Sequence, residues 1–139
     1  MSFKPALFIY FDGSYNINTK NGSIGFCIKT QGGDILDKEN RYIRDIDSNT
    51  ESEYLALKMS LEYVLKKYNS DNRLFIFGDE KTIINQLKNK QNNEQSLKYD
   101  NYISDINNLL RKFNSIVLKN IPQHENKIAH NLSNSLINN

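Results

Sequence analysis

The sequence of 139 residues has little of several features that mark particular classes of protein. Its single cysteine, Cys27, cannot form an internal disulfide, and no group of cysteines and histidines suggests structural zinc. No apolar run reaches 18 residues, and there is no secretory signal, so we expect a cytoplasmic protein without membrane contact. The net charge is only +2, which neither indicates nor excludes a polyanionic partner.

Tryptophan is also absent, and tyrosine and phenylalanine supply the aromatic fraction of 11%. With a hydrophobic fraction of 38%, the composition is that of an ordinary globular protein. The length is close to the commonest domain size and allows a sizeable core. Because repeats and low-complexity linkers are lacking, we expect a single domain over residues 1–139, and a monomer.

Three strands are predicted near the start of the chain. Ala6–Phe11 is almost continuously apolar, which is typical of a strand buried on both faces. After a turn-rich stretch, Gly13–Gly22, the alternation in Ile24–Ile28 predicts a half-buried strand. Gln31–Asp34 is a hairpin signal that leads to a third strand within Ile35–Arg44. Short connections predict that these strands form an antiparallel meander.

The rest of the chain is predicted to be mainly helical. Apolar spacings of three and four indicate helices, and short apolar runs indicate strands. The expected elements are, in order, a helix from Thr50 to about Tyr68, a strand Arg73–Phe77, a helix carrying Ile83, Ile84 and Leu87, a polar loop Asn89–Gln95, a helix from about Ser96 to Phe113, a strand Ile116–Leu118 and, after Pro122, a final helix with core positions Ile128, Leu132 and Leu136.

This order predicts an α/β fold. Its mixed five-stranded sheet combines a three-strand antiparallel meander with two parallel strands, flanked by helices. The first and fourth strands lack polar alternation and should be the most buried. Each leads directly into an acidic residue, Asp12 and Asp79. Function in open α/β sheets gathers at the carboxyl ends of strands, so this edge is a candidate site.

Each candidate side chain also has a purely structural interpretation. Asp12 belongs to an Asp-Gly pair, which is common in turns. The segment Thr50–Glu53 fits a capping box, in which Glu53 would only start the helix. Asp79 could be a helix N-cap, and His130 a solvated histidine. Taken singly, each residue favours the structural interpretation.

The three acids together favour a metal site. Mg²⁺ needs several oxygen ligands that converge from separate elements. A pair of such ions about 4 Å apart can activate a water and stabilise a leaving oxygen in phosphodiester hydrolysis. Asp12, Glu53 and Asp79 are predicted to supply this convergence.

Four sequence blocks resemble the ribonuclease H family, in order and over nearly the whole chain. The blocks are Tyr10–Ser14, Asn49–Leu57, Phe77–Asp79 with Ile84–Leu87, and Ile121–Leu132. The resemblance implies a ribonuclease H-like fold. It also implies that Asp12, Glu53 and Asp79 are the core catalytic and metal-binding carboxylates, with Asp12 bridging two Mg²⁺ or Mn²⁺ ions.

The same resemblance assigns substrate binding to Gly13, Ser14 and Asn49, the last of them contacting the RNA strand. The fourth acidic position of the family falls on His130, which is therefore a candidate catalytic and metal-binding residue. A neutral imidazole can bind Mn²⁺ but suits the harder Mg²⁺ poorly.

The expected function is that of an endoribonuclease that hydrolyses the RNA strand of RNA–DNA hybrids, with double-stranded RNA as another candidate partner. The segment Lys88–Gln95 lacks the tryptophan and the dense basic cluster of the protrusion found in several family members. Since each lost phosphate contact lowers affinity, we expect weak, distributive substrate binding.

Three other functions are considered. A catalytically weakened ribonuclease H-like nucleic-acid-binding domain would keep the carboxylates while His130 prevents turnover. A sugar-kinase or actin-like ATPase would need a second such domain and a longer chain. A 3′–5′ exonuclease of related fold would have Asp-x-Glu on its first strand, where this chain has Asp12–Ser14.

Overall fold

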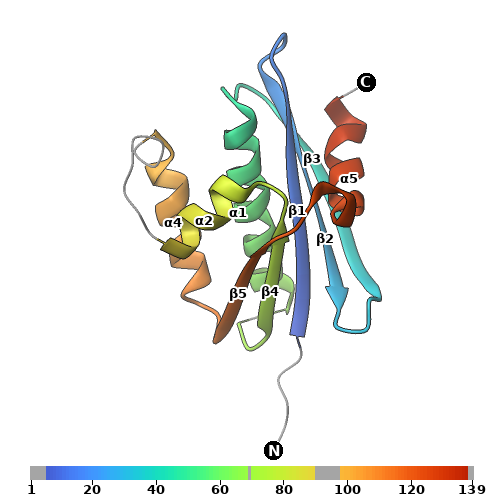
Figure 1. Cartoon of the computed structure of the whole chain (residues 1–139), viewed down its shortest axis with the longest axis vertical. Coiled ribbons are helices and arrows are strands. Elements are labelled where there is room, and N and C mark those ends of the chain that lie inside the picture. Colours follow the sequence, from blue (N-terminus) through green and yellow to red (C-terminus); the bar gives the residue numbers. More distant parts are fainter. Residues whose placement is uncertain (1–5, 69, 90–97, 138–139) are drawn as a thin grey trace, which may run out of the picture.

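The computed structural model describes residues 6–68, 70–89 and 98–137. Within these ranges the elements are, along the chain, β1 (Ala6–Asn16), β2 (Asn21–Thr30), β3 (Ile35–Ile43), α1 (Asn49–Tyr68), β4 (Arg73–Gly78), α2 (Lys81–Asn89), α4 (Asp100–Leu110), β5 (Ser115–Asn120), the short 3₁₀ helix η1 (Gln123–Glu125) and α5 (Lys127–Ile137) (Figure 1).

The five strands form one mixed sheet in the order β3-β2-β1-β4-β5. β1, β2 and β3 pair antiparallel, whereas β4 is parallel to β1 and β5 is parallel to β4. This confirms the predicted meander with two added parallel strands. Helices α1, α2 and α4 lie on one side of the sheet, and α5 lies on the other (Figure 1).

The main core lies between the sheet and α1. Alternate side chains of the two central strands point into it and meet the apolar stripe of α1. The buried residues of this contact include Leu7, Ile9, Phe11, Leu57, Leu61, Val64, Leu74 and Ile76. Full burial of one such side chain stabilises the fold by about 1.5–3 kcal/mol, so this contact fixes how α1 lies on β1 and β4.

Strand β1 continues well past the Asp-Gly pair, so the turn interpretation of Asp12 is wrong. Asp12 lies opposite Gly25 in the antiparallel pairing with β2, which extends to Asn16. This ladder satisfies the backbone groups that a turn at Gly13 would have left unpaired. A Cβ at Gly13 would lie 2.5 Å from the carbonyl carbon of Ser52, so this glycine lets α1 approach the strand closely.

Burial of the strands differs from the prediction in three places. In β1, expected to be buried on both faces, Phe8 and Tyr10 are partly exposed. β2, expected to be half-buried, is buried over residues 22–28, because α5 covers its second face. A Cβ at Gly25 would lie 2.7 Å from the carbonyl oxygen of Ala129, so the glycine allows this close contact. β4, expected to be buried on both faces, alternates between buried and partly exposed residues.

The starts of two helices also differ from the prediction. The Ser48 hydroxyl accepts the Glu51 backbone N–H at 3.0 Å and therefore caps α1. Glu53 is the fifth residue of this helix, beyond its first turn, and the capping interpretation is wrong for it. Asp79 is not the N-cap of α2, since the backbone carbonyl of Glu80 accepts the N–H of Ile84 and the helix begins at Lys81.

The last two helices differ from the prediction, α4 in its length and α5 in its buried face. The helix expected over Ser96–Phe113 is observed as Asp100–Leu110, while Ser96 and most of the loop Asn89–Gln95 lie outside the described residues. In α5 the buried residues are Ala129 and Ser133, and the predicted core positions are Ile128, Leu132 and Leu136, which are only partly buried. Small side chains permit the close contact between α5 and β2. None of the helices within the described ranges has the length and apolar character needed to cross a membrane.

Candidate functional site

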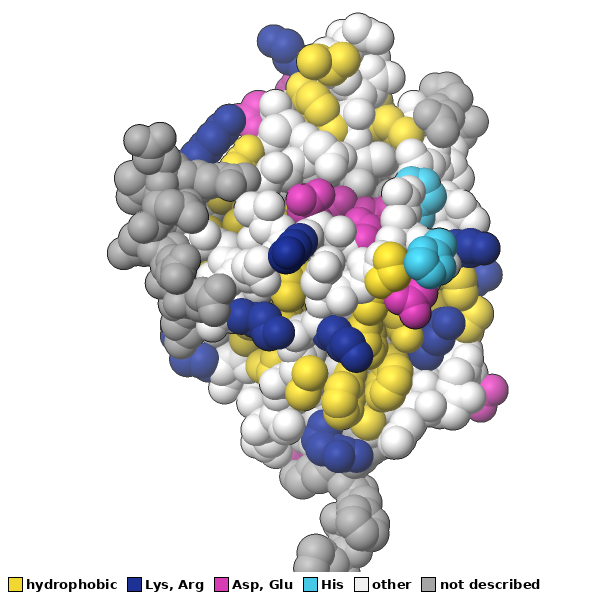
Figure 2. All heavy atoms as spheres, viewed as in Figure 1, with side chains coloured by type: hydrophobic (Ala, Val, Ile, Leu, Met, Phe, Trp, Pro, Cys, Tyr) yellow, Lys and Arg dark blue, Asp and Glu magenta, His cyan; other side chains and the backbone are white. Residues whose placement is uncertain are grey.

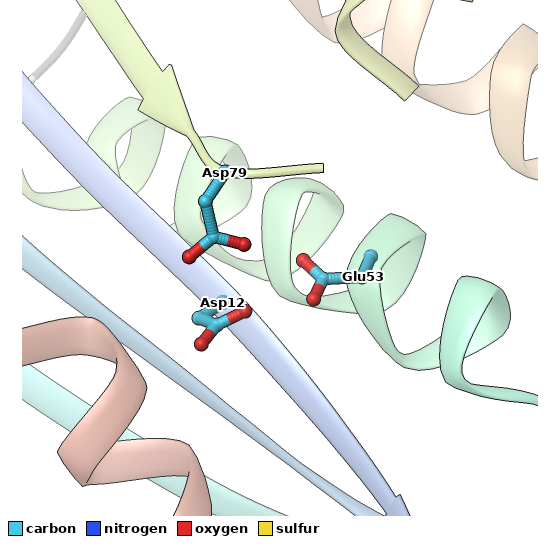
Figure 3. A group of neighbouring side chains, drawn as sticks. All are labelled: Asp12, Glu53 and Asp79. Carbon is cyan, nitrogen blue, oxygen red and sulfur yellow. The ribbon is translucent and has the colours of Figure 1, made fainter. Parts of the chain in front are cut away.

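Three carboxylates from distant parts of the chain meet at one edge of the sheet. Asp12 projects from within β1, Glu53 from α1 and Asp79 from the residue that follows β4 (Figure 3). One oxygen of each lies within 4.8 Å of the others. Asp12 and Glu53 are almost fully enclosed, with exposed fractions of 3% and 2%. The structure thus brings together the three acids expected from the sequence.

This crowding disfavours ionisation of the cluster. Burial raises the pKa of Glu53 well above its usual value, and the hydrogen bond and charge of Asp12 and the charge of Asp79 raise it further. The pKa of Asp79 is raised by burial and by the charge of Asp12. A bound cation would reverse this penalty, because it stabilises the charged form of every carboxylate around it.

The donor set fits a divalent metal. The three carboxylates offer hard oxygen ligands, which suit Mg²⁺ and Mn²⁺. The Oε2 atom of Glu53 is buried and has no hydrogen-bond partner among the described residues. A buried acceptor of this kind costs free energy unless a ligand satisfies it, which supports a cation at this position.

The imidazole of His130 closes one side of the cluster. Its Nδ1 atom lies 3.0 Å from Oδ2 of Asp12, while Oδ1 of Asp12 accepts the backbone N–H of Gly13 at 3.0 Å. The side chain of His130 is 37% exposed, yet it contacts the acidic site, so the interpretation as a purely solvated residue is wrong. Side-chain amide nitrogens of Gln123 and Asn134 lie 3.1–3.2 Å from its ring nitrogens.

Two further residues of the site are absent from the sequence prediction. Asn126, which is 1% exposed, donates to the carbonyl of Phe11 at 2.8 Å and to Oδ2 of Asp79 at 3.1 Å. It therefore connects the start of α5 with β1 and with the acid beyond β4. Its place directly before the last helix was the available signal, but that position alone indicates only an N-cap. Glu80 is a partly buried acid whose pKa is raised by burial and by the charges of Asp79 and Asp12.

The three expected substrate-binding residues lie around this site in different settings. Gly13 packs against α1 directly beside Asp12. The hydroxyl of Ser14 is buried and donates to the carbonyl of Ser133 at 3.1 Å, which ties β1 to α5. Asn49 is the first residue of α1 and is exposed.

The family of the chain follows from its comparison with known families. A family model described as reverse transcriptase-like matches residues 10–136. The chain belongs to the reverse transcriptase-like family. Its sheet and helices are those of a ribonuclease H-like domain, as the resemblance implied. No curated protein matches the chain.

Solved structures share this fold along nearly the whole chain. Ribonuclease H1 from the archaeon Halobacterium salinarum is 22% identical, with a TM-score of 0.86 over 96% of this chain and 98% of that one. LC11-RNase H1, solved in complex with an RNA/DNA hybrid, is 25% identical, with a TM-score of 0.81 over 93% and 94%. The foamy viral protease-reverse transcriptase, also solved with a hybrid, is 14% identical, with a TM-score of 0.74 over 96% of this chain and 20% of that one.

Proposed function

We propose that this ribonuclease H-like domain is an endoribonuclease that hydrolyses the RNA strand of RNA–DNA hybrids with two divalent ions, Mg²⁺ or Mn²⁺. The observation that carries the proposal is the set of carboxylate oxygens of Asp12, Glu53 and Asp79 within 4.8 Å of one another. The similarity to LC11-RNase H1, which binds an RNA/DNA hybrid in its structure, supports the choice of substrate.

We assign each residue of the site a separate role in this reaction. Asp12, Glu53 and Asp79 would hold the ions, which supply a more acidic water and charge stabilisation at the leaving oxygen. Asn126 holds the carboxylate of Asp79 in place through its 3.1 Å hydrogen bond. His130, in contact with Asp12, would bind or carry a proton at the open side of the cluster.

Substrate binding would use the surface around these acids. We assign Asn49 to contact with the RNA strand, because its exposed side chain begins the helix that carries Glu53. The 2′-hydroxyl of that strand distinguishes RNA from DNA. Gly13 would allow close approach of the backbone, and Ser14 would hold β1 against α5 through its bond to Ser133.

One contact favours a second candidate function, a ribonuclease H-like domain that binds hybrids with weakened catalysis. The imidazole of His130 lies at hydrogen-bond distance from Oδ2 of Asp12, an atom that would otherwise be available to a metal. In this case hybrid binding would persist without turnover.

A cleavage assay separates the two functions. A hybrid with a labelled RNA strand is incubated with the protein in Mg²⁺, in Mn²⁺ or in EDTA. Internal cleavage of the RNA strand in either metal and its loss in EDTA are expected from the nuclease. Binding of the same hybrid without cleavage in both metals would identify the binding domain instead.

A further inference from the structure

An aromatic patch covers one face of the two central strands. It consists of Phe8 and Tyr10 on β1 and Phe75 and Phe77 on β4, all of them partly exposed. The parallel pairing places Phe8 beside Phe75 and Tyr10 beside Phe77. The rings of Phe8 and Phe75 have centroids 5.0 Å apart, and those of Tyr10 and Phe77 are stacked at 4.8 Å with an angle of 18°.

The described part of the chain covers this patch only in part. The opposite faces of β1 and β4 point into the core against α1. On the side of the patch, α5 packs against β2, β1 and β3. Val117 of β5, beside Phe75 in the pairing, is 43% exposed. Exposed clusters of large aromatic side chains mark binding surfaces more often than isolated ones.

Lysines outnumber acids beside the aromatic patch. The ammonium of Lys29 lies 5.1 Å from the centre of the Tyr10 ring, and Lys119 is paired with Phe77 in the sheet. Tyr10 also lines two depressions; Lys29 and Lys127 line one of them and Lys119 the other, while the single acid Glu125 lines both. Figure 2 shows the band of hydrophobic side chains with several lysine and arginine side chains and one acidic side chain beside it. This combination is complementary to a chain of phosphates with unstacked bases.

The patch leads directly to the acidic cluster. Because side chains two apart on a strand share a face, Phe8, Tyr10 and Asp12 follow one another along β1. On β4, Phe75 and Phe77 share this face, and Asp79 directly follows the end of the strand. In Figure 2 the acidic side chains lie at one end of the hydrophobic band.

We propose that the aromatic patch binds a single-stranded segment of nucleic acid that continues from the duplex held at the acidic cluster. Its bases would stack on the four rings, and its phosphates would contact Lys29 and Lys119. Stacking requires free base faces, which a single strand has and a duplex lacks. Two copies of the chain joined through this patch would bring its lysines together, which disfavours self-association. The link to the duplex depends on the proposed function, whereas binding of a free single strand does not.

The experiment measures fluorescence anisotropy of a labelled single-stranded DNA of about 12 nucleotides, in EDTA so that no cleavage occurs. The double variant Phe8→Leu with Phe75→Leu keeps apolar side chains but removes two stacking surfaces. We expect it to weaken binding by about 5-fold to 100-fold, the range of lost base stacking. The control is Tyr42→Leu, an aromatic side chain on β3 that is 42% exposed and lies away from the patch. It should leave the affinity unchanged.

A second measurement tests the charges. Lys119→Gln should reduce the slope of log affinity against log salt by about 0.7, the value for one phosphate contact of a single strand. The exposed Lys66 of α1 provides the control, and Lys66→Gln should leave the slope unchanged.

A third measurement connects the patch with the duplex. A hybrid with a single-stranded DNA tail should bind wild-type protein more tightly than the blunt hybrid. The ratio of these two affinities should fall toward one in Phe8→Leu with Phe75→Leu.

Equal single-strand affinity in this variant and the wild type would overturn the proposal, even if the protein cleaves hybrids. Dimerisation in sedimentation velocity that the variant abolishes would also overturn it. Stacking-dependent binding without any nuclease activity would support the patch and refute only the proposed function.

Discussion

The Nδ1 atom of His130 and the Oδ2 atom of Asp12 lie 3.0 Å apart, although 118 residues separate them in the sequence. This contact joins the last helix to the first strand at the acidic cluster. Asp12 is held from its other side by the backbone N–H of Gly13. The two contacts together engage both oxygens of the Asp12 carboxylate.

The first prediction concerns the charge of Asp12. Asp12→Asn keeps the shape of the side chain but removes a charged oxygen ligand, so hydrolysis of a hybrid should fall by about 1,000-fold or more. The melting temperature should stay the same or rise, because like-charge crowding with Glu53 is relieved. The control is Asp34→Asn in the exposed β2–β3 turn, which should cleave normally. Wild-type turnover in Asp12→Asn would refute the assigned site.

The second prediction concerns pH and metal binding through Glu53. An unfolded Glu ionises near its usual pKa of 4.5, whereas the folded protein retains the proton to higher pH. The folded state then binds more protons than the unfolded state, so the free energy of unfolding falls as the pH rises above 4.5. In EDTA, melting temperatures from pH 5 to about pH 8 should show this loss, and Glu53→Gln should reduce it.

Divalent ions should reverse the loss at neutral pH. At about 100 times the dissociation constant a ligand adds about 2.7 kcal/mol, which raises the melting temperature of a domain of this size by roughly 10 °C. Glu53→Gln should shrink the shift, and Glu62→Gln, an exposed change on the same helix, should not. No shift with saturating Mg²⁺ or Mn²⁺ would count against a metal site.

The third prediction concerns Asn126 as a positioning residue. Its hydrogen bond lowers the pKa of Asp79, so Asn126→Ala should raise that pKa. In a plot of activity against pH, the acidic limb should then move to higher pH. We expect kcat to fall by about 10-fold to 100-fold, as for other residues that orient metal ligands. Asn131→Ala, on the exposed face of α5, is the matched control. Lower activity with an unmoved acidic limb would mean that Asn126 acts only on stability.

Much of this architecture was predictable because its patterns are local. The apolar runs of β1 and β4, the hairpin before β3 and the helical spacing of α1 each indicate one element, and their order limits the sheet topology. Asp12 and Asp79 could be grouped because neighbouring parallel strands were expected to end at a common edge, and Glu53 joined them because a metal needs several oxygen ligands. Asn126 could not be found in this way, since its role depends on contacts with Phe11 and Asp79, which are distant in sequence.

Burial was harder to predict than strand position. An apolar strand such as β4 was expected to be covered on both faces, yet Phe75 and Phe77 are partly exposed because α5 packs on the other half of the sheet. In α5 the buried face carries Ala129 and Ser133, since close contact with Gly25 requires small side chains. Which helix covers which strands is a tertiary property that periodicity alone does not determine.

The last prediction concerns His130, the residue on which the sequence resemblance to ribonuclease H places the fourth acidic position. Imidazole is a better ligand for Mn²⁺ than for Mg²⁺, so wild-type activity should be higher with Mn²⁺. His130→Ala should lower turnover by about 10-fold to 100-fold, because it removes a proton carrier or an accessory ligand but none of the three acids. His130→Asp should give good activity with Mg²⁺, since it supplies a hard oxygen. His124→Ala changes the only other histidine, which is exposed, and is the control. All four proteins are compared on one hybrid with both metals, and equal rates for His130→Ala and wild type with each metal would show that the contact with Asp12 has no part in catalysis.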